Sequence, residues 1–351
     1  MSQKLLTRNS FREAVFARDG YKCVLCGKTA AETLEGKLDA HHLVERRLFT
    51  APEELGGYFL DNGVTVCEYD HMRCEQTLVS VEEARAAAKI TKAVLPSHFY
   101  EDVPVDKWGN TILPNGTRLR GELFFDVSVQ KVLSDVMHLF TKYVKYSRSY
   151  HLPWSPGVSN DDRVQHDLSG LDNKEVVITL KLDGECTTIY DDYIHARSLE
   201  YAPRVDRDRM KALHSSIAYE IPEGWRICGE NVWAEHSIKY TDLPAVFFVF
   251  SIWNEKNECL SWDETVAYAN MLGLQTVPVL YRGAWDESYV KKFVAEPHFA
   301  KEAEGYVVRT VDSFAYSEFR KKLLKFVRAN HVRTQAHWTR MIHPNDFLEN
   351  S

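Results

Sequence analysis

The sequence predicts an α+β protein built mainly on antiparallel sheets, with a small metal-binding unit in front. Residues 158–351 contain many short runs of β-branched and aromatic residues, interrupted by only two helical patterns, which is typical of antiparallel sheets. Residues 1–95 hold four of the seven cysteines and a histidine pair. Residues 96–157 contain turns, a hairpin signal and one helical pattern. We therefore expect three segments: a metal unit, a connecting module and a catalytic domain.

The first segment is expected to open with a short helix from Ser10 to about Gly20, because Ser10 and Glu13 have the spacing of a capping box. A second helix, rich in Ala and Glu, is expected over about 81–93. Between these helices lie a Cys-x-x-Cys knuckle and further candidate ligands. A closed thiolate site for Zn²⁺ can hold together a unit that is too small for a good core. The knuckle and the following cysteines are Cys23, Cys26, Cys67 and Cys74.

The connecting segment is punctuated by Pro and Gly over 104–121, and Asn115-Gly116 is its clearest turn signal. An apolar stripe predicts a helix over about 127–146. The segment 151–157, which contains two prolines, is expected to be a rigid connector. In the third segment we expect helices near 208–219 and 263–271. Strands are expected at 176–180, 187–190, 225–228, 245–252, 306–310 and 323–327.

Composition places the chain among ordinary globular proteins. It has 351 residues, 44% hydrophobic and 26% charged, with a net charge of −7. No apolar run approaches the roughly 18 residues of a membrane span, so no membrane partner is expected. The first residues lack the pattern of a signal peptide, in which a charged stretch is followed by an apolar one. An odd number of cysteines argues against a disulfide framework. We expect an intracellular, cytoplasmic protein. Oligomeric state is left open.

The segment Lys181-Leu-Asp183-Gly184-Glu185 follows a β run, so Lys181 and Asp183 are expected on the same face. Gly184 permits the close approach of a ligand. A lysine can serve as a nucleophile when neighbouring cations lower its pKa, and transfer of a phosphoryl group then depends on positioning and charge neutralisation. A Lys-x-Asp-Gly match alone is weak, because a polar strand end before a turn gives the same pattern.

Five more motifs follow in order: His195–Ser198, Gly229–Asn231, Phe247–Ile252, Glu304–Val308 and Leu324–Arg328. Together with the lysine segment they resemble the lysine nucleotidyltransferases, the superfamily of ATP-dependent DNA ligases, RNA ligases and capping enzymes. The resemblance implies a ligase-type nucleotidyltransferase domain, ATP and Mg²⁺ or Mn²⁺. Lys181 would become adenylylated, and Asp183 and Gly184 would lie at the nucleotide. The other implied roles are nucleotide contact for Arg197, ribose binding for Glu230, adenine stacking for Phe250, metal support for Glu304 and α-phosphate contact for Lys325, with Arg328 as a second cation because position 327 is Val.

Two further stretches, His236–Tyr240 and His331–Trp338, resemble RNA ligases of the Deinococcus nick-sealing type. Few residues follow Arg328, and no C-terminal OB-fold is expected, which favours an RNA ligase over a DNA ligase or capping enzyme. Family resemblance also suggests a bacterial or phage-like source. The expected partner is RNA or a nicked RNA-containing duplex.

The first segment contains, in order, Cys23-x-x-Cys26, Asp39-Ala-His41-His42, Asn62, Cys67 and His71. This order resembles an HNH (ββα-metal) endonuclease unit. The resemblance implies His42 as general base, Asn62 as the residue that orients the loop, and His41, His71 and Glu75 as ligands of a divalent metal. The usual second cysteine pair is incomplete, so the fourth zinc ligand is Cys74 or Asp70. Cys74 is slightly favoured, because a thiolate suits structural zinc better.

The leading hypothesis is an ATP-dependent RNA ligase for RNA repair, which seals 3′-hydroxyl/5′-phosphate nicks through a lysyl–AMP intermediate. The alternative is a chain that is primarily an HNH endonuclease, with the ligase half as a binding platform. In a third hypothesis the zinc unit only binds nucleic acid. Complete ligase motifs favour the first hypothesis, and the complete His-Asn-His set keeps the second open.

Overall fold

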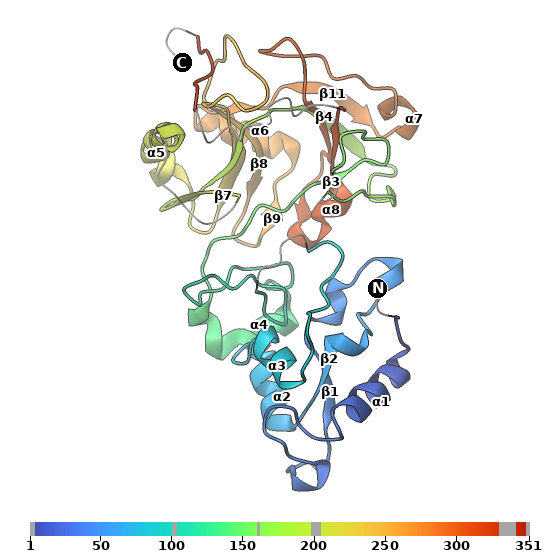
Figure 1. Ribbon diagram of the computed structural model, residues 1–351. Helices are drawn as coiled ribbons and strands as arrows, with labels where there is room; N and C mark the ends of the chain where they lie inside the picture. The colour runs from blue at the N-terminus through green and yellow to red at the C-terminus, as the bar shows by residue number, and fades with distance from the viewer. Residues whose placement is uncertain (1–3, 100–103, 160–161, 198–204, 330–341, 349–351) are drawn as a thin grey trace. The chain divides into compact units, whose positions relative to one another are not determined.

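The computed structural model describes residues 4–99, 104–159, 162–197, 205–329 and 342–348 (Figure 1). The chain divides into two compact units, residues 1–144 and 145–351. Residues 96–144 of the expected connecting module therefore lie in the first unit, and residues 145–157 in the second. The expected motif at His331–Trp338 lies outside the described residues. No helix among the described residues is long and apolar enough to cross a membrane.

The first unit is built around the hairpin of β1 (Asp39–His42) and β2 (Gly63–Val66), followed directly by helix α2 (Glu68–Glu75). The strands are antiparallel, with Asp39 opposite Val66. Helix α1 (Arg8–Arg18) packs so closely on the hairpin that a Cβ at Gly63 would lie 2.4 Å from the Phe11 ring. The order of elements at the hairpin is thus strand, strand, helix.

Helix boundaries in the first unit differ from expectation in three places. Helix α1 begins at Arg8, not Ser10, because Thr7 is its cap and accepts from the Ser10 amide at 3.3 Å. Helix α3 (Val81–Ala87) ends before the expected 93, and Lys89 has a φ of 57°. Helix α4 (Val127–Leu133) continues only as a 3-10 turn, Ser134–Leu139, because the chain then bonds to the backbone of Arg118. The remaining 3-10 turns are η1 (Ala30–Glu32), η2 (Arg46–Leu48), η3 (Pro52–Glu54) and η4 (Leu60–Asn62).

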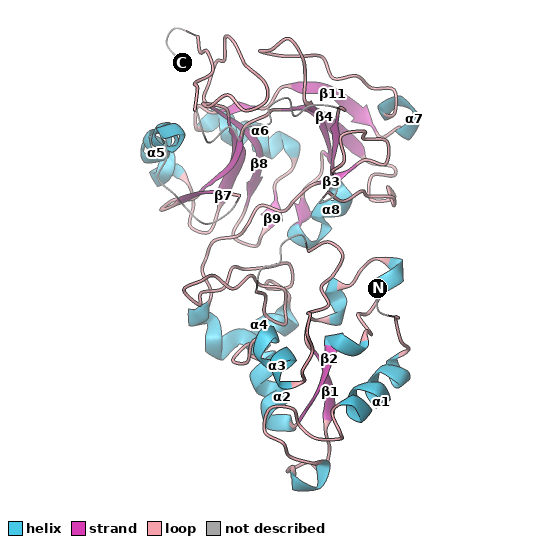
Figure 2. Ribbon diagram, in the orientation of Figure 1, coloured by secondary structure: helices cyan, strands magenta, loops and turns pink. Residues whose placement is uncertain are grey.

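The second unit contains two sheets, which Figure 2 shows in magenta. The larger has the order β13-β9-β8-β7-β5-β6, with β10 paired to β8, and the smaller has the order β11-β4-β12-β14-β3. Every pair is antiparallel except β10 with β8 and β3 with β14. The strands are β3 (Tyr150–His151), β4 (Glu175–Lys181), β5 (Glu185–Ile189), β6 (Ile194–Ala196), β7 (Arg226–Asn231), β8 (Phe247–Trp253), β9 (Glu258–Cys259), β10 (Gln275–Thr276), β11 (Val279–Ala284), β12 (Gly305–Thr310), β13 (Phe314–Ala315) and β14 (Leu323–Val327).

The expected α+β class with antiparallel sheets is thus confirmed for this unit, and each strand expected from a β-branched run is present. Helices were expected near 208–219 and 263–271, and the structure has α5 (Val205–Ile217) and α6 (Trp262–Met271). Shorter helical pieces are η6 (Ala218–Glu220), α7 (Glu287–Val290), η7 (Tyr316–Glu318) and α8 (Phe319–Lys322). A core formed by β4, β8 and α6 packs behind the end of β4, and its members include Val177, Leu180, Phe248 and Trp262.

Candidate active site

Lys181 is the last residue of β4, the strand between β11 and β12. Its Nζ donates to Glu304 Oε2 at 2.7 Å. Glu304 comes directly before β12, whose Gly305 pairs with Lys181, so sheet register brings the two side chains together. Burial favours the neutral amine, but the carboxylates of Glu304 and Glu230 outweigh it and raise the pKa of Lys181 above its ordinary value. As long as no bound metal ion offsets these carboxylates, Lys181 carries its proton as an ammonium.

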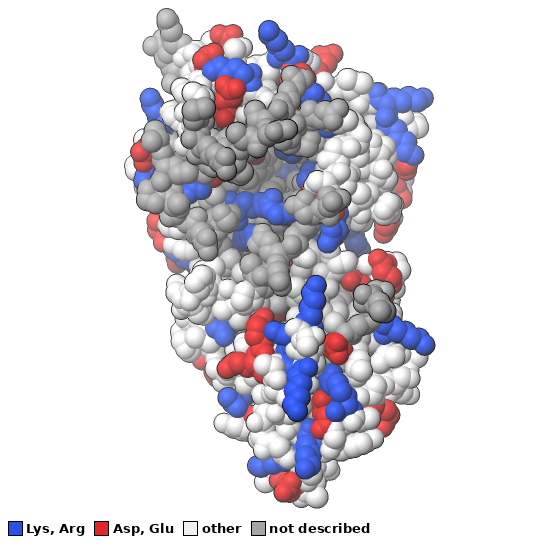
Figure 3. All heavy atoms as spheres, in the orientation of Figure 1, with Lys and Arg blue, Asp and Glu red and all other residues white. Residues whose placement is uncertain are grey.

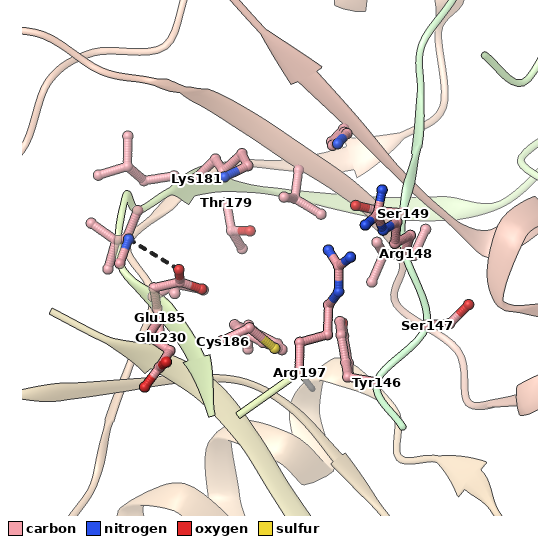
Figure 4. A pocket seen from close by; sticks show the side chains of 18 of the residues that line it. Tyr146, Ser147, Arg148, Ser149, Thr179, Lys181, Glu185, Cys186, Arg197 and Glu230 are labelled. Carbon is pink, nitrogen blue, oxygen red and sulfur yellow. Dashed lines mark hydrogen bonds between the residues drawn. The ribbon is translucent and has the colours of Figure 1, made fainter. Parts of the chain in front are cut away.

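Lys181 lines a cavity of about 430 Å³, a size within the usual range for small-molecule sites. Figure 4 shows Arg197, from the end of β6, and Arg148, from the segment before β3, reaching into it. Basic side chains outnumber acidic ones in the lining, which suits a polyphosphate anion. The basic members are Arg148, Lys181, Arg197, Arg309 and Lys325, and the acidic members are Glu185 and Glu230.

Glu230 on β7 lines the same cavity, and its Oε1 accepts from the Gly184 amide at 3.1 Å. A Cβ at Gly184 would lie 2.4 Å from the Asn231 carbonyl oxygen, so only glycine fits there. Burial raises the pKa of Glu230 to about 8; Lys181 opposes this shift, while Glu304 and Asp183 add to it. The carboxyl groups of Glu304, Glu230 and Asp183 therefore all act on one lysine amine, and a bound divalent cation would favour their ionised forms.

Asp183 does not line the cavity but holds a neighbouring loop. Its Oδ2 accepts from the amides of Ser237 and Ile238 at 2.7 and 3.0 Å. The Asp183 amide donates to the hydroxyl of Tyr240 at 2.8 Å. The expected nucleotide contact of Asp183 stays a prediction, whereas its described contacts are those of a loop anchor.

The loop beyond Asp183 is itself held by Asn345, which is 3% exposed. Asn345 Oδ1 accepts from the Tyr240 amide at 2.8 Å, and its Nδ2 donates to the carbonyls of Val232 and Ala234 at 2.9 and 3.1 Å. No sequence pattern indicated a role for Asn345. A short C-terminal segment therefore fixes the loop that fixes Asp183.

Phe250 on β8 lines the cavity, together with apolar residues such as Leu180 and Val277. Tyr146 lies beside it, with the ring centroids 5.0 Å apart. The two rings are tilted by 54° and contact each other, so each offers one face to the cavity rather than a gap between them. The adenine role expected for Phe250 stays a prediction. Tyr146 and Arg148 were missed by the sequence reading, although alternating aromatic and basic residues over 143–150 could have indicated them.

Lys325 lies on β14 and lines the cavity. Its Nζ donates to Asp162 Oδ1 at 3.0 Å. Burial lowers the pKa of Lys325 and Asp162 opposes that shift. The same Asp162 oxygen lies 3.2 Å from His151 Nε2. The segment 151–157 was expected to be only a connector. Its first residue, His151, instead belongs to β3 and contacts the aspartate that holds Lys325.

Arg328 does not line the cavity; its Nη1 is paired with Glu302 Oε2 at 2.8 Å. Val327 is buried, and its amide donates to Ser155 Oγ at 2.9 Å. The valine is thus explained by burial. Arg148 is a better candidate than Arg328 for the second cation, because it lines the cavity and Arg328 does not.

In the first unit, three thiols and a carboxylate gather within 4.8 Å of one another: Cys23, Cys26, Cys67 and Asp70. Asp70 Oδ2 accepts from the Cys23 and Cys67 thiols at 3.2 and 3.4 Å. Burial raises the pKa of Cys26 to about 12, and Asp70 adds to the shift, so metal binding must displace protons. The donor set fits a tetrahedral Zn²⁺ site. The structure brings Asp70 to the thiols and buries Cys74 in the core, which favours Asp70 over Cys74 as the fourth ligand. The zinc site itself stays a prediction.

The second group of possible ligands is His41, His71 and Glu75, whose donor atoms lie within 4.8 Å of one another. Glu75 Oε1 is 3.2 Å from His71 Nε2 and 3.5 Å from His41 Nδ1. Burial lowers the pKa of His41 well below its ordinary value, so its imidazole is neutral, as a metal ligand must be. These donors fit a divalent metal ion.

His42 and Asn62 flank that group in different ways. The His42 ring stacks on Phe11 with centroids 4.6 Å apart, and burial lowers the pKa of His42 to about 4. Its Nε2 is buried without a hydrogen-bond partner among the described residues. Asn62 Oδ1 accepts from the Val44 amide at 3.0 Å, and Nδ2 donates to the Gly57 carbonyl at 3.0 Å. Asn62 therefore orients the loop as expected, and the general-base role of His42 stays a prediction.

Comparison with known proteins identifies the part of the chain that holds the cavity. The family model described as RNA ligase matches residues 174–327. Solved structures of the Naegleria gruberi RNA ligase are similar: the form with PPi has 18% identity over 54% of this chain and 56% of that chain, with a TM-score of 0.40. A mutant with ATP and Mn has 15% identity over 55% of this chain and 58% of that chain, with a TM-score of 0.38. The chain thus spans less than two thirds of their length.

No curated protein matches the chain. Within the segment matched by the family model lie the lysine, both glutamates and the aromatic ring described above. Residues 174–327, which carry Lys181, Glu230, Phe250, Glu304 and Lys325, are therefore similar to the RNA ligase family.

Proposed function

We propose that the chain is an ATP-dependent RNA ligase that seals 3′-hydroxyl/5′-phosphate nicks. The observation that carries the proposal is the pairing of Lys181 Nζ with Glu304 Oε2 at the edge of a cation-lined cavity. Apart from residues 146–149, the lining of this cavity lies on the segment that matches the RNA ligase model. RNA repair is the process that such an activity would serve.

In the first step Lys181 Nζ, after losing a proton, attacks the α-phosphorus of ATP. The N–P bond forms, the bond between the α-phosphorus and the bridging oxygen breaks, and pyrophosphate leaves. A divalent ion supported by Glu304 would neutralise phosphate charge and release the lysine from its ion pair, and Glu230 would bind the ribose. Arg148, Arg197 and Lys325 bind the phosphates, and Phe250 with Tyr146 holds the base.

In the later steps AMP passes from Lys181 to the 5′-phosphate of the nick. The 3′-hydroxyl oxygen then attacks that phosphate, an O–P bond forms and AMP leaves. The expected partner is a nicked duplex that contains RNA, recognised through phosphates and 2′-hydroxyls rather than base edges. Lysine and arginine side chains gather on the face of the first unit seen in Figure 3, and this supports backbone contact.

The test is labelling with ATP that carries radioactive phosphorus at the α-position. Wild-type protein should form a covalent adduct and Lys181→Ala should not. Lys174→Ala is the matched control, because Lys174 precedes the same strand and pairs only with the exposed Asp312. An unlabelled wild-type protein would overturn the proposal. Sealing of nicks that differ only in ribose or deoxyribose at the 3′-hydroxyl then tests the RNA assignment.

A second candidate function, metal-dependent strand cleavage of the HNH type, is favoured by the His41, His71 and Glu75 group on a strand–strand–helix unit. Cleavage of duplex RNA or DNA with Mg²⁺ or Mn²⁺ that disappears in His42→Ala would support it. If zinc removal weakens nick binding and no cleavage is detected, the unit acts as a binding module only.

A further inference from the structure

The first unit contains a turn that reaches across the end of α2. Asp106 Oδ1 accepts from the amides of Trp108 and Asn110 at 2.9 and 3.0 Å, and Gly109 takes a φ of 79°. The Lys107 carbonyl accepts from the Glu45 amide at 2.8 Å. Trp108 Nε1 donates to the carbonyl of Glu75 at 2.7 Å. The turn is therefore fixed in place.

This turn brings a buried lysine to the carboxylate of Glu75. The Lys107 side chain is 8% exposed, and its Nζ donates to Glu75 Oε1. A second carboxylate, that of Glu45, has Oε2 at 3.8 Å from Nζ, and the Trp108 ring lies 5.2 Å away. A buried ammonium is tolerated only where it is paired in this way.

The oxygen that accepts from Lys107 is also the one that a metal would require. Glu75 Oε1 is the atom nearest to both imidazole donors, His71 Nε2 at 3.2 Å and His41 Nδ1 at 3.5 Å. A divalent ion held by these three atoms and an ammonium on the same oxygen would use the same lone pairs and repel each other. HNH motif residues alone do not predict this arrangement, since Lys107 lies outside them.

We propose that Lys107 is a built-in competitor of the divalent ion at the His41–His71–Glu75 site. In the metal-free protein the ammonium supplies the positive charge that Glu75 needs. Metal binding requires Nζ to leave Glu75 Oε1, and Glu45 Oε2 is the carboxylate that receives it. The inference concerns this site alone and does not depend on the proposed ligase function.

The test is Mn²⁺ binding to the full, zinc-loaded chain without nucleotide, followed by the electron paramagnetic resonance signal of free Mn²⁺. Lys107→Met, which keeps the length and removes the charge, should bind Mn²⁺ on the order of 10-fold more tightly than wild type, the size typical of changes beside metal ligands. The gain should vanish in the double variant with His71→Ala, which assigns it to this site. Lys92→Met, exposed on the same unit, is the matched control.

Glu45→Gln provides a test of opposite sign. It removes the second acceptor, so Lys107 should hold Glu75 more strongly and Mn²⁺ affinity should fall. Lys107→Gln repeats the charge removal if the methionine variant does not fold. Unchanged or weaker Mn²⁺ binding in the charge-removed variants overturns the proposal, as does a Glu45→Gln variant that binds more tightly than wild type.

Discussion

Each unit of the molecule pairs a lysine of a candidate site with a glutamate, and the two pairs differ in what surrounds them. Lys181 pairs with Glu304 beside a cavity of about 430 Å³ lined by further cations. Lys107 pairs with Glu75 under a rigid turn, with two imidazoles on the same carboxylate oxygen. A ligand can reach the first lysine, whereas the second is enclosed by protein groups. In the functions proposed above, the pair at Glu304 keeps a nucleophilic amine protonated until ATP binds. The pair at Glu75 occupies the position of a metal ion.

The largest expected difference between the pairs comes from Lys→Arg substitution, which keeps the charge but removes the proton chemistry. A guanidinium is not deprotonated in proteins, so Lys181→Arg should form no detectable lysyl–AMP. Lys107→Arg keeps a cation on Glu75 and should retain the weak Mn²⁺ binding of wild type. Labelling with ATP and Mn²⁺ titration measure the two outcomes. An adduct in Lys181→Arg would remove Lys181 from its role.

Zinc should stabilise only the first unit. Removing a structural metal ligand such as Cys23, by Cys23→Ser, should cost the first unit at least about 4 kcal/mol of unfolding free energy. Adenylylation, which uses the second unit, should continue. Calorimetry and zinc content measure this effect.

Asp70→Asn should also lose zinc and Cys74→Ala should keep it; the reverse result would restore Cys74 as the fourth ligand.

The second unit should lose stability in acid through His195. Burial lowers the pKa of His195 to about 4, so the unfolded chain, with an ordinary value near 6.5, takes up the proton first. Stability should therefore fall as the pH drops from about 6.5 to 4, by up to about 1.4 kcal/mol per pH unit. Urea unfolding at several pH values measures the slope. His195→Gln should flatten it, and an unchanged slope would assign the acid sensitivity elsewhere.

The smallest expected effect concerns the anchor of Lys325. Asp162→Asn removes a charge-assisted hydrogen bond and should slow lysyl–AMP formation about 10-fold, with the loss in the rate at saturating ATP. Asp167→Asn, an exposed neighbour that bonds to Ser169, is the control. Equal rates for both variants would show that Lys325 is positioned by its strand alone.

Much of the second unit could be predicted from the sequence because its signals are local. The β-branched runs became β4, β5, β7, β8, β12 and β14, and Lys181, Glu230, Phe250 and Lys325 all lie at the cavity. The sequence did not assign three residues to the site, namely Tyr146, Arg148 and Asp162. They lie close to β3 in the chain, and the pairing of β3 with β14 brings them to a site made of residues far away in the sequence. No local pattern reports such a contact.

The difference between the expected fourth thiol ligand, Cys74, and the residue that the structure places at the thiols, Asp70, has another cause. Ligand type favoured Cys74, but helix geometry decided the outcome: Cys67 caps α2, and Asp70, three residues later, turns back toward the cap. Cys74 lies a further turn along the helix, on the side that packs into the core. The spacing of a helix cap, read together with the cysteines, would have indicated Asp70. Lys107 could not be found in this way, because nothing in the motif points to a turn 32 residues beyond Glu75.

Asn345 follows the other residues of the site in the sequence, so its contacts with the loop are the last that the site can gain during synthesis. It ties the backbone at Val232, Ala234 and Tyr240, and the loop they bound carries the two amides that hold Asp183. A growing chain on the ribosome has made Lys181 and every cavity strand before it makes residue 345. The loop that holds Asp183 therefore lacks this tie until residue 345 has been made.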